Sequence, residues 1–173
     1  IILNCSASNE MIGKADYRRQ LVCGQSGRLI CAYVYSSAGD GESTQDMVFA
    51  GHNVIAENGS LLCETRLFEN GMIATEADVQ RLANERRKNT TFTNDAEGVE
   101  IVEFSMPLTE TKLTRYIAKT PFVPTSDNDR ASRCEAILAM QSNGLKKRLM
   151  HTRAQTAVIG ISGGLDSCLA LLV

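Results

Sequence analysis

The sequence lacks the features that are typical of nucleic-acid-binding, membrane and secreted proteins. It contains no tryptophan, two histidines and three prolines among 173 residues. Its 18 lysines and arginines are balanced by 20 acidic residues and are scattered among them, so no basic stripe points to a nucleic-acid groove. No apolar run approaches the ~20 residues of a membrane-spanning helix, and Ile1-Ile2-Leu3 is too short for a signal-peptide core. We therefore expect a cytoplasmic protein that binds neither nucleic acid nor membrane.

The cysteines also lack the spacing of a metal site or a disulfide framework. Their gaps are wide and irregular, no Cys-x-x-Cys pair occurs, and the two histidines do not complete a cluster. Reduced thiols are the expected state. The six are Cys5, Cys23, Cys31, Cys63, Cys134 and Cys168. A polar loop holds three acids that we expect to be solvated: Asp40, Glu42 and Asp46.

What is present is an apolar content of 43%, enough for a packed core, in a pattern that predicts an α/β fold. Runs rich in β-branched and aromatic residues alternate with helical spacing. Asn58-Gly59 between two such runs predicts a tight hairpin. The expected strands are residues 1–4, 29–35, 47–49, 53–56, 60–65, 99–105 and 157–161.

Helices are expected at three places before the C-terminal loop. The first covers 15–24 and turns Tyr17, Leu21 and Val22 inward, and the second begins at a capping box on Thr75 and runs to about residue 89. The third begins at a capping box on Ser132. All three prolines lie within 107–131, so this stretch is expected to connect two domains, with a boundary near 125–131.

The chain closes on "VIGISGGLDSCLALLV", which reads as strand, glycine turn and helix start. Glycines between a strand and a helix let backbone N–H groups approach an anion, and the helix N-terminus adds partial positive charge. Phosphate is therefore the expected ligand. Neither the lysine-containing P-loop nor GxGxxG is present, and a serine-glycine turn without function is the alternative.

The run Ser162-Gly163-Gly164-Leu165-Asp166-Ser167 resembles the SGGxDS motif of the ATP pyrophosphatase family. The resemblance implies that the loop grips the pyrophosphate of ATP while AMP is transferred to a substrate carboxylate or carbonyl. Both serine hydroxyls can donate to phosphate oxygens, and Asp166 can hold Mg²⁺. The implied ATP-binding residues are Gly160, Ile161, Ser162, Gly163, Gly164, Leu165, Asp166 and Ser167.

The stretches "ILNCSASNEMIGKADYRRQL" and "AYVYSSAGDGESTQDMVFAGHNVIAENGSLL" resemble the C-terminal part of a nitrilase-type amidase domain. An amidase joined to an SGGxDS domain is similar to the glutamine-dependent NAD synthetase family. The resemblance implies an α-β-β-α sandwich portion over 1–125, a linker over 126–131, and the start of a doubly wound parallel sheet over 132–173. It also implies a segment of a larger enzyme, because the last helix would stop after roughly two turns.

The family resemblance implies a division of labour. The amidase domain hydrolyses glutamine, ammonia passes through a tunnel, and the synthetase domain adenylates the nicotinate carboxylate of deamido-NAD before ammonia displaces AMP. The family's Glu-Lys-Cys triad would precede Ile1, so no catalytic residue is expected here and the segment alone should be inert. The parent enzyme is expected to be a homo-oligomer.

Two residues match positions at which the family holds glutamine, namely Ser8 and Lys14; the alternatives are a turn hydroxyl and a solvated lysine. Cys5 is expected to be a buried packing thiol and not a nucleophile. His52 and His151 are expected to be plain surface or packing histidines.

Three other functions remain open on the sequence alone. One is another ammonia-fed ligase of the ATP-pyrophosphatase class, against which the nitrilase-like front half argues. A second is a carbon–nitrogen hydrolase whose SGGLDS is incidental. A third is an interaction module without activity of its own.

Overall fold

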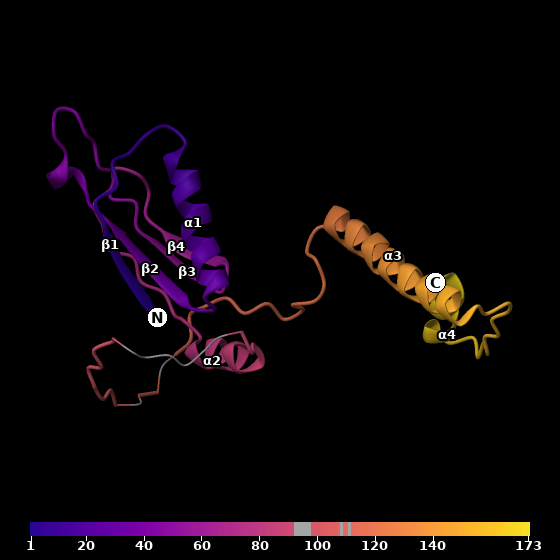
Figure 1. The fold of residues 1–173 in the computed structure, drawn as a ribbon. Coiled ribbons are helices and arrows are strands. Elements are labelled where there is room, and N and C mark those ends of the chain that lie inside the picture. Colours follow the sequence, from indigo (N-terminus) through magenta and orange to yellow (C-terminus); the bar gives the residue numbers. More distant parts are fainter. Residues whose placement is uncertain (92–97, 108, 111) are drawn as a thin grey trace. The chain divides into compact units, whose positions relative to one another are not determined.

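The computed structural model describes residues 1–91, 98–107, 109–110 and 112–173 (Figure 1). Contacts divide the chain into two units, Ile1–Arg115 and Tyr116–Val173. Each unit is described by itself.

The first unit is built on a four-stranded mixed sheet in the order β1-β2-β3-β4. β1 and β2 are parallel, and α1 (Lys14–Arg28) makes the crossover that such a pair requires. The remaining pairs are antiparallel. The strands are β1 (Ile2–Ser6), β2 (Ala32–Ser37), β3 (Val54–Glu57) and β4 (Ser60–Glu64).

The predicted Asn58-Gly59 hairpin joins β3 to β4. Both residues have positive φ, 46° and 88°, as a turn between two twisted strands requires. The backbone N–H of Gly59 donates to Ser26 Oγ of α1 at 2.9 Å. A Cβ on Gly27 would lie 3.2 Å from Gly59 Cα, so the helix and the turn can approach this closely because both residues are glycines.

The core of this unit lies between α1 and one face of the sheet. Val22 of the helix packs on Tyr35, Val54 and Ala56, all 7% exposed or less. The predicted burial of Val22 is confirmed. The predicted burial of Tyr17 and Leu21 is wrong, because these side chains are 62% and 47% exposed. The buried stripe of α1 instead runs at a spacing of four residues and is largely polar: Arg18, Val22 and Ser26.

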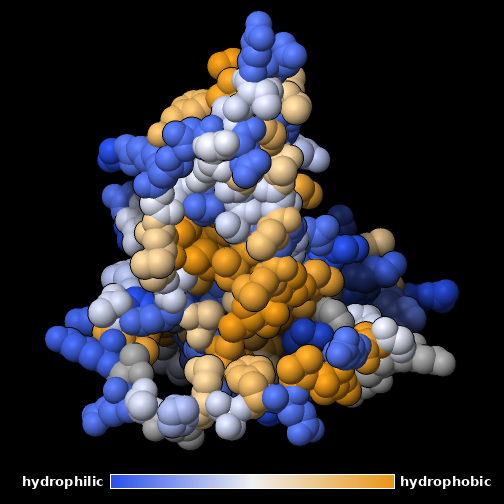
Figure 2. All heavy atoms as spheres, turned by 90° about the vertical axis from the view of Figure 1, so that its left-hand side faces the viewer, coloured by the Kyte–Doolittle hydropathy of each residue, from blue (hydrophilic) through white to orange (hydrophobic). Residues whose placement is uncertain are grey.

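The opposite face of the sheet is only partly covered. Leu3 pairs with Val34, Val34 with Ile55 and Ile55 with Cys63, which places these side chains on one face. Ile55 is 9% exposed, whereas Leu3 on the edge strand is 75% exposed. Figure 2, which looks from the left of Figure 1, shows a broad hydrophobic area across the middle of the molecule on that side.

One predicted strand of this unit, 47–49, is wrong. Its backbone bonds to loops and not to a strand: Thr44 N donates to Met47 O and Glu10 N donates to Val48 O. A 3₁₀ turn, η1 (Asp40–Glu42), precedes it. The predicted strand 99–105 is also absent, since its backbone has no strand assignment over 99–105 and Val102 and Phe104 are 76% and 83% exposed.

Two helices begin at caps other than those the sequence favoured. α2 (Val79–Lys88) is capped by Asp78, which accepts from Arg81 N at 2.9 Å, and not by Thr75. α3 (Asp127–Thr152) is capped by Ser126, which accepts from Asp129 N at 3.0 Å, and not by Ser132. Both regions are rich in oxygen-bearing side chains that can cap a helix, so the sequence offered several candidates.

The second unit consists of α3 and α4 (Leu165–Leu172) with the loop between them. The predicted strand 157–161 is wrong here, because Tyr116–Val173 contains no strand assignment with which it could pair. The doubly wound parallel sheet expected from 132 onward is therefore not formed within these residues. Two positions of the expected connector, 108 and 111, lie outside the described residues.

Candidate functional sites

The loop 160–167 leads into α4 and holds every residue that the sequence assigned to ATP. Gly163 has φ of 83°, a left-handed conformation that glycine adopts without strain, and Gly164 is the residue before the helix. A Cβ on Gly160 or Gly163 would meet nothing within 4 Å. The glycines therefore leave the backbone of this loop open to a ligand.

Two serine hydroxyls meet across the loop. Ser167 Oγ donates to Gly164 O at 3.0 Å and lies 3.4 Å from Ser162 Oγ. Ser162 N donates to Ser167 Oγ at 3.3 Å, and Gly164 N donates to Ser162 Oγ at 3.4 Å. These last contacts are long for hydrogen bonds, so the two N–H groups can be redirected to a stronger acceptor at small cost.

Asp166 lies in the first turn of α4 and is exposed. With Arg148 and Leu169 it lines a hollow between α3 and α4, both within the second unit. Hydroxyl and backbone N–H donors suit phosphate oxygens, and a carboxylate oxygen is a preferred ligand of Mg²⁺. The donor set of this loop fits MgATP.

Ser8 and Lys14 lie in the first unit, at either end of the loop between β1 and α1. Ser8 is half-buried, and Lys14 is the first residue of the helix. Lys14 Nζ donates to both oxygens of Asn9, the carbonyl at 2.6 Å and Oδ1 at 2.8 Å. The lysine that the sequence assigned to glutamine thus ties this loop to the start of α1.

Cys5 is exposed, so the expectation of a buried packing thiol is wrong. It lies in β1, on the same side of the strand as Leu3 and away from α1. By contrast, burial raises the pKa of the Cys23, Cys31 and Cys63 thiols, which makes them less nucleophilic.

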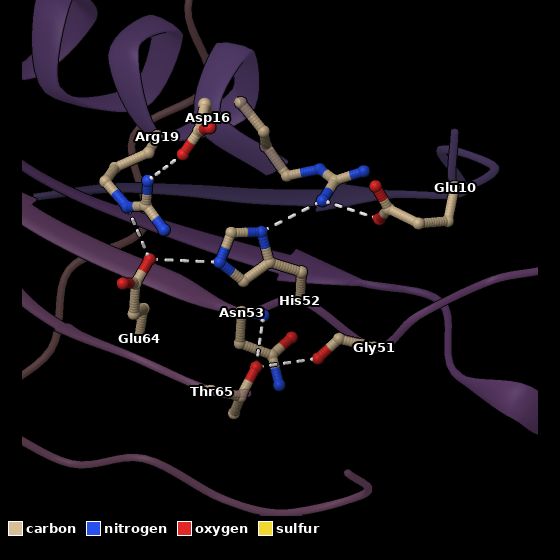
Figure 3. Close-up of polar contacts among 9 residues, drawn as sticks. Glu10, Asp16, Arg19, Gly51, His52, Asn53, Glu64 and Thr65 are labelled. Carbon is tan, nitrogen blue, oxygen red and sulfur yellow. Dashed lines mark hydrogen bonds and ion pairs between the residues drawn. The ribbon is translucent and has the colours of Figure 1, made fainter. Parts of the chain in front are cut away.

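The sequence missed a buried polar network that crosses the first unit (Figure 3). His52 is 2% exposed and lies between two charged groups: its Nδ1 is 2.9 Å from Arg18 Nη1, and its Nε2 is 3.0 Å from Glu64 Oε2. Arg18, itself 3% exposed, also donates to Glu10 Oε2 at 2.9 Å. Arg19 Nε donates to the same Glu64 oxygen at 2.8 Å.

The partners of His52 fix its tautomer. A guanidinium can only donate, so Nδ1 accepts, and the carboxylate of Glu64 accepts from a proton on Nε2. The hydrogen bond from Arg19, followed by that from His52, lowers the pKa of Glu64. His52 is therefore a neutral link between a buried cation and a carboxylate, where the sequence predicted only a packing or surface residue. His151 is exposed on α3, which confirms the prediction of a surface histidine and not that of a packing histidine.

A buried ion pair outside this network was also missed. Glu57 is 3% exposed and accepts two hydrogen bonds from Arg115. Nη1 donates to Oε2 at 2.9 Å, and Nη2 donates to Oε1 at 2.8 Å. Glu76 accepts from Thr114 N, Thr114 Oγ1 and Arg115 N. The bonds to Glu57 attach the end of the first unit to β3, and those to Glu76 attach it to the segment before α2. The hydrogen bond from Arg115 is the main cause that lowers the pKa of Glu57.

The acids of the polar loop do not gather into a metal centre. Within the described ranges, no group of three or more histidine, cysteine, aspartate or glutamate side chains is placed to hold a metal ion. Asp40 is exposed and accepts from Asn70 Nδ2 at 2.5 Å. Asp166 therefore stands as a single candidate ligand and not as part of a protein-built site.

Comparison with known proteins finds relatives that align with the whole of this chain. The glutamine-dependent NAD(+) synthetase of Mycobacterium tuberculosis is 36% identical over 184 aligned residues, and that of Mycobacterium leprae is 37% identical. Both alignments cover 100% of this chain. The whole of this chain is therefore similar to part of these synthetases.

The chain spans only 27% of the length of those relatives. A glutamine-dependent NAD(+) synthetase structure from Cytophaga hutchinsonii is 36% identical where it matches, over 36% of this chain and 11% of that one, with a TM-score of 0.33. No protein-family model matches the chain. None of the described helices is long and apolar enough to cross a membrane.

Proposed function

We propose that this chain serves glutamine-dependent NAD synthesis, as part of a polypeptide that also contains regions matching the rest of its relatives. The observation that carries the proposal is similarity over the whole of this chain to part of the enzymes of that name, in a chain whose SGGLDS loop opens a helix. Residues 1–125 would belong to a nitrilase-like amidase domain, 126–131 to a linker and 132–173 to the start of an ATP-pyrophosphatase domain.

In the synthetase step, the loop 160–167 binds the phosphates of ATP. The hydroxyls of Ser162 and Ser167 and the N–H groups of the glycine turn donate to phosphate oxygens, and the N-terminus of α4 favours their negative charge. Asp166 would hold Mg²⁺, and the ion would supply positive charge beside the phosphate oxygens. AMP passes to the nicotinate carboxylate of deamido-NAD, and ammonia then displaces it to give the amide.

In the amidase step, Ser8 and Lys14 contribute to the binding of glutamine. Ser8 offers a hydroxyl at a half-buried position, and Lys14 keeps one N–H beyond the two that hold Asn9. The nucleophile, the base and the oxyanion-stabilising lysine would be supplied by the amidase portion outside this chain. A homo-oligomer and a cytoplasmic location complete the proposal.

The test is made on the polypeptide that contains this chain. Purified protein should form NAD from deamido-NAD and ATP with either glutamine or ammonia as nitrogen source, and should catalyse pyrophosphate exchange into ATP that depends on deamido-NAD. Exchange without any requirement for deamido-NAD would indicate a different ligase of the same class. Glutamine hydrolysis with no exchange at all would contradict the synthetase assignment.

A further inference from the structure

The loop between β1 and α1 is held in place at several points. Glu10 N donates to Val48 O at 2.6 Å, and the Glu10 carboxylate accepts from Arg18. Its neighbour Asn9 is held by Lys14. Ser8, the proposed glutamine contact, lies two residues before Glu10, so the backbone that carries its hydroxyl is set by these bonds.

Arg18 is in turn held by His52. Arg18 Nη1 donates one hydrogen bond to the imidazole and another to Glu10, so the guanidinium is oriented between these two groups. Figure 3 shows His52 and Glu10 on either side of it. On its other side His52 donates to Glu64, the last residue of β4, which Arg19 also binds. A continuous chain of bonds thus runs from the sheet through His52 to the loop.

Filling the core with these charged groups lowers the stability of the fold. Arg18 Nε, Arg18 Nη2 and Glu10 Oε1 are buried and have no hydrogen-bond partner among the described residues. Leaving such groups unpaired destabilises a fold, and apolar residues of similar volume often serve stability as well or better. The benefit of the network therefore lies in the geometry that it imposes on the groups at its ends.

We propose that His52 is a positioning residue of the glutamine site, acting through Arg18 and Glu10 to hold the loop that carries Ser8. It does not contact glutamine itself. This inference rests on the proposed function, because it assumes that the loop faces glutamine in the complete enzyme.

The test uses two substitutions of His52 in the complete enzyme. His52→Gln keeps an acceptor for Arg18 and a donor for Glu64 at similar spacing, whereas His52→Leu removes both at similar volume. His52→Leu should raise the KM for glutamine about tenfold, a change of about 1.4 kcal/mol, with kcat nearly unchanged. His52→Gln should restore the KM to within about twofold of the parent.

Ammonia-dependent NAD synthesis separates positioning from structural damage. It should be unchanged in both variants, because ammonia bypasses the glutamine site. Equal losses with glutamine and ammonia, or a glutamine KM that His52→Leu does not raise, would overturn the inference. The proposed function is judged separately, on whether the unmodified enzyme makes NAD at all. His151→Leu, the same substitution at the exposed histidine of α3, is the control and should leave the KM unchanged.

If His52→Leu does not fold, Glu10→Gln provides the same test, because Glu10 is the other residue that binds Arg18. It keeps the size and an acceptor atom but removes the charge that Arg18 binds. The KM for glutamine should rise at least about threefold while the ammonia reaction is unchanged. An unchanged KM in a folded Glu10→Gln enzyme would overturn the inference equally.

Discussion

Asp166 differs from the other acids of the second unit in its surroundings. It follows a turn of two glycines and stands at the start of α4, where two serine hydroxyls and the helix N-terminus all favour an anion. The N-terminus of α4 stabilises the carboxylate by itself, but a phosphate bound beside it would be repelled, so the two fit together if a cation lies between them. That is the physical reason for assigning Mg²⁺ to Asp166.

Replacing Asp166 with Asn should therefore cripple the synthetase step. An amide is a weaker Mg²⁺ ligand than a carboxylate, so kcat for NAD synthesis should fall by roughly a hundredfold or more with either nitrogen source. Glutamine hydrolysis should remain measurable. Asp127→Asn, which changes an exposed acid in the first turn of α3, is the matched control. An Asp166→Asn enzyme that makes NAD at the normal rate would remove Asp166 from the site.

Ser8 should matter for binding and not for the chemical step. The loss of one hydrogen bond costs ~0.5–1.5 kcal/mol, so Ser8→Ala should raise the KM for glutamine roughly two- to tenfold. Synthesis from ammonia should be unaffected. Steady-state kinetics with both nitrogen sources provide the measurement, with Ser60→Ala at an exposed position of β4 as control. An equal loss with ammonia would show that Ser8 supports the fold.

The two kinds of site residue differ in how far the sequence could predict them. The SGGLDS loop is local: its residues are adjacent, and the turn that brings the two serines together needs only glycine. The network of His52 joins residues 12 and 34 positions apart in the sequence. Arginine and histidine are usually solvated, so no composition rule placed Arg18 in the core. The one available signal was its spacing of four from Val22 on α1.

At the scale of elements, the same contrast between local and distant contacts decides which predictions held. The β3–β4 hairpin and the strand–helix–strand unit around α1 were predicted because turn residues and helical spacing lie within short stretches. The predicted strands 99–105 and 157–161 were wrong because a strand needs a partner, and apolar β-branched residues alone do not supply one. The predicted first residues of α2 and α3 differ from the observed ones, because several nearby residues could serve as the cap.

The attachment of Arg115 to the β3–β4 hairpin should contribute strongly to the stability of the first unit. Arg115→Met leaves the buried Glu57 without its counter-ion, with only the hydrogen bond from Asp78 N at 2.7 Å, and we expect a loss of roughly 2–3 kcal/mol in the free energy of unfolding. This is below the range for fully buried pairs because the Arg115 side chain is 23% exposed. Arg66→Met breaks an exposed pair with Glu69 and should change stability by about 0.5 kcal/mol or less. Equal effects of the two substitutions in denaturant titrations would contradict the assignment.

The pH dependence of that stability has a definite sign. The pKa of Glu57 is lowered in the folded state, chiefly by Arg115, so folding favours the ionised form. The resulting stabilisation is fully present above the ordinary glutamate pKa of about 4.3 and is lost as pH falls through the lower folded value. Unfolding of the parent and of Arg115→Met should therefore differ most near neutrality and converge in acid. A difference that grows below pH 4 would contradict this origin.

At the scale of the whole molecule, each of the two units leaves apolar or polar groups uncovered that a further layer of structure could contact. Its first unit leaves one sheet face partly open, with Leu3 75% exposed on the edge strand β1, and Figure 2 shows the hydrophobic area on that side. Its second unit presents the phosphate loop without neighbouring strands among residues 116–173. Both features agree with the 27% of relative length that the chain spans.

The 173-residue chain by itself should therefore be inert. Glutamine hydrolysis needs an activated nucleophile, and the thiols of Cys23, Cys31 and Cys63 have a raised pKa because they are buried. The loop 160–167 would bind ATP weakly, because no parallel strands hold its backbone in one conformation. Glutaminase assays and calorimetric titration with MgATP should both give no signal above buffer. Cys5 is the fully exposed thiol of the first unit, so hydrolysis of glutamine that disappears in Cys5→Ser would overturn this prediction and assign catalysis to the chain itself.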